Sequence, residues 1–141
     1  MTSSPLTRPI PSTGEQIPAI GIGSYQTFDV SEPRTVQPVL ARFLELGGSV
    51  IDTSPMYARS EAAIGTVMTA LRKANPKTPT PWLATKVWTS GKDEGLAQMK
   101  KSLQRLGTPL DQDVNVEWVQ DEDPGVVAVH FTTARGPVRI D

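Results

Sequence analysis

The sequence predicts an α/β fold in which short buried strands alternate with amphipathic helices. Three apolar runs are bounded by turn residues and have the length of buried strands: 19–25, 50–51 and 82–88. Apolar residues recur at helical spacing after each of these runs, over 35–46, 60–75 and 93–106. Strands that alternate with such helices pair in parallel through right-handed crossovers. We therefore expect three consecutive βα units.

Composition limits the class of protein. The chain has 141 residues, of which 38% are hydrophobic, so we expect one domain with a modest core. The formal net charge is −1 and no basic face is evident, which argues against a nucleic-acid partner. Cysteine is absent, which excludes disulfides, a thiol nucleophile and a cysteine metal site, and we predict no metal site of another kind.

The first residues carry no apolar core of the kind a secretory signal needs. No stretch approaches the roughly 20 apolar residues that span a bilayer. We therefore expect a soluble, cytoplasmic protein without a membrane partner.

The N-terminal segment predicts a small hairpin ahead of the βα units. Residues 1–7 have the composition of a disordered tail, and a glycine-containing turn at 12–14 suggests a hairpin over 10–17. In the strand that follows, Gly21 and Gly23 would let another backbone or a ligand approach closely. The run is a poor phosphate signature, because a third glycine and a following helix are missing.

Helix ends are marked by particular residues. Gly47 is expected to end the first helix in a left-handed conformation. Ser60 can cap the second helix, where Glu61 suits the positive end of the helix dipole. Pro76 ends that helix.

Three polar residues follow or end the predicted strands. Asp52 follows the strand 50–51, a turn at Pro55 delivers Tyr57, and Lys86 lies in the apolar strand 82–88. In a closed barrel of βα units, the carboxyl ends of the strands share one face, so these side chains would meet there.

The chemistry of this trio favours proton donation. A free phenol has a pKa of about 10. A neighbouring ammonium favours the phenolate, which makes the phenol a better acid, and a carboxylate can fix the ammonium. Such a group could protonate the alkoxide that forms when a carbonyl is reduced. Spacing alone also allows a buried ion pair between Asp52 and Lys86 beside an unrelated Tyr57.

Four motifs in this order bring a family resemblance: IPAIGIGSY, VIDTSPMYARSE, WLATKVW and QMKKSLQRLG. Over roughly residues 8–110 they resemble the N-terminal part of the aldo-keto reductases, NAD(P)H-dependent carbonyl reductases on a (β/α)8, or TIM, barrel. The resemblance implies that Asp52, Tyr57 and Lys86 belong to the family's Asp-Tyr-Lys-His tetrad, with Tyr57 as proton donor.

The same resemblance implies binding residues. Gly23, Ser24, Tyr25 and Asp52 match positions that line the nicotinamide end of NADPH or NADH, and Tyr25 and Trp88 match positions beside the substrate pocket. The implied substrate is a small carbonyl compound.

The chain departs from the family after residue 107. A valine stands at or near the place of the tetrad's histidine, and His130 comes much later in the sequence. A lone histidine is either structural or catalytic, and we expect His130 to lie outside the site. Strand-like runs at 114–119 and 126–131 are too close for a crossover helix, so we expect an antiparallel hairpin. That hairpin could pair along the open sheet edge, where self-association can also occur.

We therefore expect an incomplete barrel over 1–110 and a divergent tail, strand-rich or disordered, over 111–141. A complete barrel takes about 250 residues, and a truncated or frame-disrupted gene would explain the difference. Two functional interpretations remain: an aldo-keto reductase acting on aldehydes or ketones, or a non-catalytic remnant or association module. On either interpretation, we expect the isolated chain to bind NADPH or NADH weakly or not at all.

Overall fold

The computed structural model describes residues 5–11, 13–108, 114–120 and 127–133, the last two stretches as backbone. The elements in chain order are β1 (Thr7–Pro9), β2 (Gln16–Pro18), β3 (Ile22–Gly23), the 3-10 helix η1 (Pro33–Thr35), α1 (Gln37–Glu45), β4 (Val50–Asp52), α2 (Ser60–Ala74), β5 (Trp82–Val87), α3 (Lys92–Arg105), β6 (Val114–Gln120) and β7 (Val127–Thr133). They form a two-stranded sheet, β1-β2, and a five-stranded sheet in the order β3-β4-β5-β7-β6.

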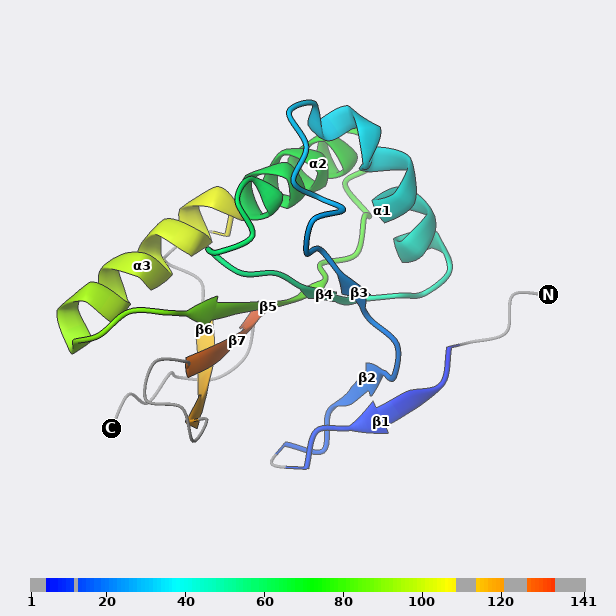
Figure 1. The fold of residues 1–141 in the computed structure, drawn as a ribbon. Helices are drawn as coiled ribbons and strands as arrows, with labels where there is room; N and C mark the ends of the chain where they lie inside the picture. The colour runs from blue at the N-terminus through cyan, green and yellow to red at the C-terminus, as the bar shows by residue number, and fades with distance from the viewer. Residues whose placement is uncertain (1–4, 12, 109–113, 121–126, 134–141) are drawn as a thin grey trace.

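The three predicted βα units are present. Strand β3 pairs in parallel with β4, with Gly23 opposite Asp52. Strand β4 pairs in parallel with β5, with Asp52 opposite Ala84. Helices α1, α2 and α3 all lie on one face of this sheet (Figure 1). The prediction of parallel strands joined by helical crossovers is therefore confirmed.

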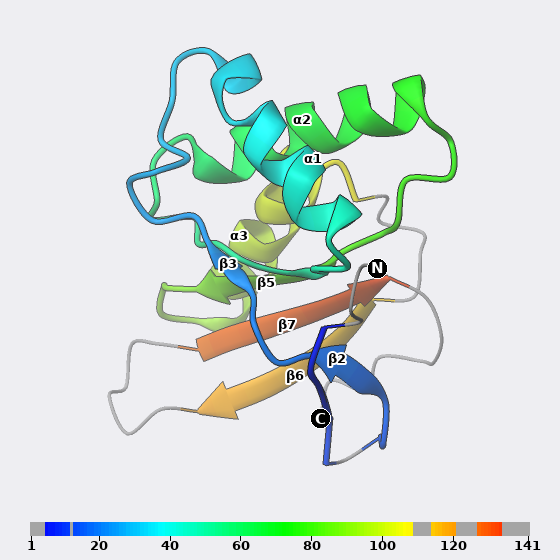
Figure 2. The same ribbon diagram turned by 90° about the vertical axis from the view of Figure 1, so that its right-hand side faces the viewer.

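The hydrophobic core lies between the sheet and these helices. Side chains of β5 alternate between buried and partly exposed, so that Leu83, Thr85 and Val87 face the helices. The core brings together apolar residues from the helices, the strands and the β3–η1 loop: Phe28, Val36, Leu40, Leu44, Ile51, Ile64, Val67, Met68, Leu83 and Leu106. In the part of the chain that the structure describes, no helix covers the opposite face of the sheet (Figure 2).

Strand β3 is shorter than predicted at both ends, because it begins at Ile22 rather than near residue 19 and ends at Gly23. The chain turns directly after Gly23, because Thr27 N–H donates to Tyr25 C=O at 2.7 Å and Phe28 N–H donates to Ser24 C=O at 3.2 Å. The predicted close approach at Gly21 is confirmed, since a Cβ there would lie 3.0 Å from the carbonyl oxygen of Val50.

The predicted helix ends are confirmed in part. Gly47 has a φ of 84°, in the left-handed region, as expected for a residue that ends α1. The capping prediction for Ser60 is wrong, because Ser60 is the first residue of α2 and Arg59 precedes it without a side-chain cap. The Ser60 hydroxyl donates instead to Ser24 C=O at 3.1 Å.

The N-terminal hairpin is confirmed. Strands β1 and β2 pair antiparallel with Arg8 opposite Ile17, and Gly14 in the turn has a φ of 73°. Thr7 belongs to β1, so the predicted disordered tail does not extend that far; residues 1–4 and Ser12 lie outside the described part of the chain.

The predicted C-terminal hairpin is also confirmed. Strands β6 and β7 pair antiparallel with Val116 opposite Phe131, and β7 pairs antiparallel with β5. The hairpin thus occupies the sheet edge where a barrel would place its next parallel strand, and the five strands form an open sheet. The division into 1–110 and 111–141 stays a prediction.

His130 lies on β7, opposite Ala84 of β5 and Glu117 of β6. Its side chain lies outside the described part of the structure, so the expectation that it stays apart from the site remains a prediction. Across the described residues, none of the helices combines the length and the apolar character needed to cross a membrane.

Candidate active site

Two parallel strands carry the carboxylate and the ammonium of the candidate site. Asp52 is the last residue of β4, and Lys86 lies near the end of the neighbouring strand β5. The Lys86 ammonium donates to Asp52 Oδ2 at 3.0 Å and Oδ1 at 3.2 Å, and to Thr53 C=O at 2.9 Å. These three hydrogen bonds match the three donors of an ammonium, so Lys86 is held in one place.

Tyr57 reaches the same place through the turn after β4. Met56 N–H donates to the Ser54 hydroxyl at 3.2 Å, and Tyr57 N–H donates to Ser54 C=O at 3.0 Å. This tight turn brings the Tyr57 ring beneath the Lys86 ammonium, with 4.8 Å between Nζ and the ring centroid. A cation over a ring face at this distance is attracted by the ring quadrupole. The predicted convergence of Asp52, Tyr57 and Lys86 is therefore present.

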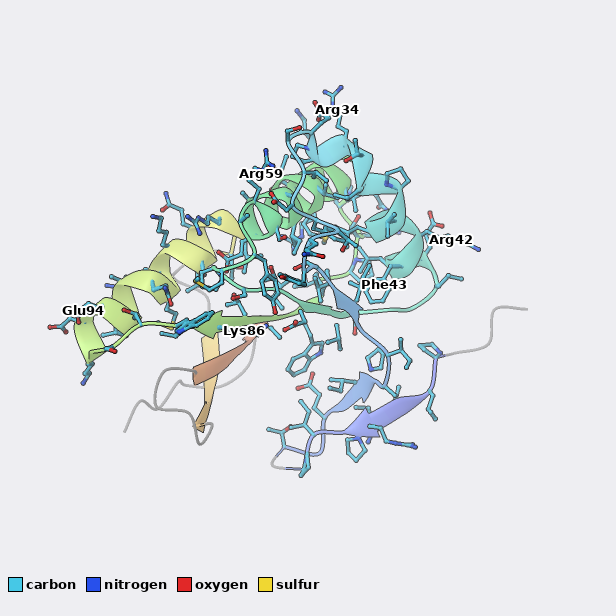
Figure 3. The ribbon with its side chains drawn as sticks, in the orientation of Figure 1. Arg34, Arg42, Phe43, Arg59, Lys86 and Glu94 are labelled. Carbon is cyan, nitrogen blue, oxygen red and sulfur yellow. The ribbon has the colours of Figure 1, made fainter. Side chains whose placement is uncertain are left out.

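Two exposed aromatic residues belong to the predicted substrate side. The Tyr25 ring packs against Tyr57 with 5.0 Å between centroids and an interplanar angle of 56°. Tyr25 is 61% exposed and Trp88 is 53% exposed. Gln98 on α3 donates to Trp88 C=O at 3.3 Å, which holds the backbone beyond β5. Figure 3 shows Lys86 at the end of β5 and Arg59 where α2 begins.

A buried carboxylate braces β5 from the helix side. Glu61, the second residue of α2, is only 1% exposed. Thr85 Oγ1 donates to Glu61 Oε1 at 2.7 Å, and Arg105 Nη1 donates to Glu61 Oε2 at 3.3 Å. Glu61 thus joins α2, β5 and α3 directly behind Lys86.

Sequence reasoning missed this brace. It treated Glu61 only as a helix-dipole partner. A glutamate in the first turn of a helix has the same sequence signal whether it is exposed or buried.

The predicted cofactor residues have different environments. A Cβ at Gly23 would meet nothing within 4 Å, so there is open space beside this backbone. The Asp52 side chain is 48% exposed. Ser24 is completely buried, and its hydroxyl has no hydrogen-bond partner among the described residues. Gly23, Asp52 and Tyr25 are therefore accessible to a ligand, whereas the Ser24 side chain is covered. The binding roles of all four residues stay predictions.

A second ion pair joins the loop that carries Tyr25 to the loop that carries Tyr57. Arg59 Nε donates to Asp29 Oδ1 at 2.7 Å. This hydrogen bond holds the pKa of the Asp29 carboxyl below its ordinary value. Among the described residues, no three His, Asp or Glu side chains gather in a way that could hold a metal ion.

Comparison with known proteins defines the class. Residues 19–127 match the sequence model of the Aldo/keto reductase family, which is well over half of the chain. The chain belongs to the aldo/keto reductase family.

Particular relatives support this assignment. An aldo/keto reductase of Synechocystis sp. is 35% identical over 99 residues, and the methylglyoxal reductase YeaE of Escherichia coli is 34% identical over 97 residues. The crystal structure of an aldo-keto reductase from Klebsiella pneumoniae in complex with NADPH matches with a TM-score of 0.56 and 27% identity.

The relatives are much longer than this chain. The matches cover 68% and 65% of this chain but only 29% of the Synechocystis protein and 32% of the E. coli protein. The Klebsiella match covers 77% of this chain and 38% of that structure. The chain thus spans about a third of the length of the curated relatives, and it contains the part that carries Asp52, Tyr57 and Lys86.

Proposed function

We propose that Asp52, Tyr57 and Lys86 form the proton-donating part of a carbonyl-reductase site, with an aldehyde or ketone as substrate. The observation that carries this proposal is the fixed position of the Lys86 ammonium. Its three hydrogen bonds to Asp52 and Thr53 hold a positive charge over the Tyr57 ring. An isolated structural ion pair would not require a tyrosine at that point.

In this mechanism Tyr57 gives its phenolic proton to the carbonyl oxygen of the substrate. The O–H bond of Tyr57 breaks, a new O–H bond forms on the product alcohol, and the phenolate that remains is stabilised by the Lys86 ammonium. Asp52 keeps that ammonium in position. Tyr25 and Trp88, both more than half exposed, would border the substrate.

NADPH, or NADH, would supply the hydride that the carbonyl carbon accepts. Gly23, Tyr25 and Asp52 are the residues we expect at its nicotinamide end. The Klebsiella relative with bound NADPH supports this cofactor class, and the E. coli methylglyoxal reductase supports a small carbonyl substrate.

The isolated 141-residue chain is expected to bind NADPH weakly or not at all. The residues named above would contact only one end of a large, charged cofactor, and the match covers only 29% and 32% of the two curated relatives. Each missing charge-assisted hydrogen bond to a phosphate would cost roughly 1.5–3 kcal/mol. Several such losses lower affinity by orders of magnitude.

A second candidate function is association without catalysis. The β6–β7 hairpin lies along β5, where a barrel would continue with a parallel strand, and this leaves β6 at the edge of the sheet. An edge strand can pair with another chain. Sedimentation of the purified chain over a range of concentrations tests this function: a concentration-dependent dimer favours it, and a strict monomer argues against it.

The catalytic proposal is tested in two settings. In the first, NADPH is titrated into the isolated chain by fluorescence, and turnover of a reactive aldehyde is measured. We expect no saturation at micromolar NADPH and no turnover above that of Tyr57→Phe. Micromolar binding with turnover that Tyr57→Phe abolishes would show that this chain is a complete reductase.

The second setting is a chimera in which residues 19–107 replace the matching segment of the E. coli methylglyoxal reductase. Aldehyde reduction by the chimera should fall about 10²–10⁴-fold in Tyr57→Phe. Arg42→Gln, on the exposed face of α1, is the matched control and should keep full turnover. A chimera that binds NADPH and turns over equally well with Tyr57→Phe would refute the proposed role of Tyr57.

A further inference from the structure

Two loops that are far apart in the sequence meet beside the candidate site. Tyr25 follows β3 and Tyr57 follows β4, and their rings pack with 5.0 Å between centroids. Two contacts fasten these loops together. Arg59 Nε donates to Asp29 Oδ1 at 2.7 Å, and the Ser60 hydroxyl donates to Ser24 C=O at 3.1 Å. We call these two contacts the loop clamp.

Both loops hold a strained residue directly after the tyrosine. Gln26 has a φ of 59° and Ala58 has a φ of 48°, and these are the non-glycine residues with positive φ in the described part of the chain. A non-glycine residue in this region costs of order 1–3 kcal/mol and persists only when its surroundings fix the backbone. The loop clamp joins Ser24 and Asp29, on either side of Gln26, to Arg59 and Ser60, which follow Ala58. It can therefore hold the backbone at both strained residues.

The Asp29–Arg59 pair differs from an ordinary surface ion pair. Arg42 and Glu45 also form an exposed pair, but they are neighbours on one helix. Asp29 and Arg59 are 30 residues apart and belong to different loops. The Arg42–Glu45 pair therefore constrains nothing beyond α1, whereas the Asp29–Arg59 pair fixes the distance between two loops.

We propose that Asp29 and Arg59 are positioning residues, which hold Tyr25 against Tyr57 and thereby fix the Tyr57 ring beneath the Lys86 ammonium. Neither residue contacts the reacting atoms in this proposal. Arg59 lies two residues after Tyr57 and directly precedes α2, so its side chain anchors the Tyr57 turn to the Tyr25 loop. The claim that this position serves proton donation rests on the proposed function; the claim that the pair holds the two rings together does not.

The test uses the isolated 141-residue chain and solution NMR. The sequence contains only two tyrosines, Tyr25 and Tyr57, so their ring signals can be assigned with Tyr25→Phe alone. In the unaltered chain we expect cross-relaxation peaks between the two rings. In Asp29→Asn and in Arg59→Gln these peaks should be lost, and the ring signals should move toward those of free tyrosine. Arg42→Gln is the matched control and should keep the peaks.

A charge swap separates positioning from general damage to the fold. Asp29→Arg and Arg59→Asp should each abolish the ring–ring peaks, and the double variant should restore them. Methyl signals of the core residues Leu40 and Ile64 report whether each variant stays folded. Peaks that persist in Asp29→Asn and Arg59→Gln, or a folded double variant that fails to restore them, would overturn the proposal.

The chimera separates this proposal from the proposed function. If the clamp positions Tyr57 for proton donation, Asp29→Asn in the chimera should lower kcat with KM for the aldehyde nearly unchanged. If Tyr57→Phe leaves turnover intact, the proposed function fails, and the NMR result still decides whether Asp29 and Arg59 hold the rings together. A kcat equal to that of the unaltered chimera, with the ring–ring peaks lost, would refute the catalytic part of the positioning claim.

Discussion

The Lys86 ammonium lies 4.8 Å from the centroid of the Tyr57 ring, while its hydrogen bonds go to Asp52 and Thr53. Among the described residues, the hydrogen bonds of this ammonium all go to Asp52 and Thr53, so the charge acts on the Tyr57 ring through space. This relationship separates two roles of Lys86, a structural one toward Asp52 and an electrostatic one toward Tyr57.

Lys86→Met should separate these two roles in experiment. The Asp52 side chain is 48% exposed, so it can be hydrated when its partner is lost. Pairs of this exposure contribute about 0–1 kcal/mol, so denaturant unfolding of the isolated chain should change by no more than that. In the chimera, aldehyde turnover should fall sharply because the phenolate loses its counter-charge. A large loss of stability with unchanged turnover would contradict this assignment.

The contacts of Glu61 behind Lys86, by contrast, should contribute mainly to stability. Glu61 is 1% exposed and bonded to Thr85 and Arg105. Glu61→Ala leaves the buried Thr85 hydroxyl without its partner, whereas Arg105, 34% exposed, can be hydrated. The free energy of unfolding should therefore fall by about 1–3 kcal/mol. Glu61→Gln keeps an acceptor for Thr85 and should cost less. Urea unfolding followed by circular dichroism measures both variants, and equal stability of all three proteins would show that the pair is not structural.

Strand and helix periodicity predicted most of the fold. The apolar runs and the helical spacing gave three βα units, because burial on one face constrains a sequence strongly. The same reasoning placed Asp52, Tyr57 and Lys86 at one end of parallel strands. The trio could be predicted because strand direction alone brings strand ends together.

Contacts between exposed loops could not be predicted in this way. Asp29 and Arg59 are polar residues in loops, and no period links them. The burial of Glu61 depends on α3 lying against α2, which only the folded chain shows. The early end of β3 likewise depends on the turn hydrogen bonds of Thr27 and Phe28, which the apolar pattern does not indicate.

Two glycines provide a matched test of how closely the helices pack. A Cβ at Gly65 on α2 would lie 2.0 Å from the carbonyl oxygen of Arg105, so Gly65→Ala must push α2 and α3 apart. Overpacking of this kind costs typically about 1–3 kcal/mol, which should exceed the gain of roughly 1 kcal/mol in helix propensity.

Gly95 on α3 is the control for this experiment. A Cβ there would lie 3.5 Å from Val87 Cγ1, an ordinary contact. Gly95→Ala should therefore raise the melting temperature, whereas Gly65→Ala should lower it. Shifts of the same sign in both variants would argue against close packing of α2 on the end of α3.

The Asp29–Arg59 pair predicts a pH dependence with a definite sign. The hydrogen bond from Arg59 lowers the pKa of Asp29, so the folded chain holds this carboxylate ionised to a lower pH than the unfolded chain does. A depressed pKa contributes stability that is present above the unfolded value, about 3.9 for aspartate, and that is lost as the pH falls through the folded value. The ring–ring peaks of Tyr25 and Tyr57 should therefore persist at neutral and mildly acidic pH and disappear only below about pH 3.9.

The measurement is a carbon-13 titration of the Asp29 carboxyl by NMR, with Arg59→Gln as its control. Arg59 is the charged group that contacts this carboxyl among the described residues. In the unaltered chain the midpoint should lie below that of Arg59→Gln, where it should return toward about 3.9. Equal midpoints with and without Arg59 would show that the 2.7 Å contact does not hold the loops in solution.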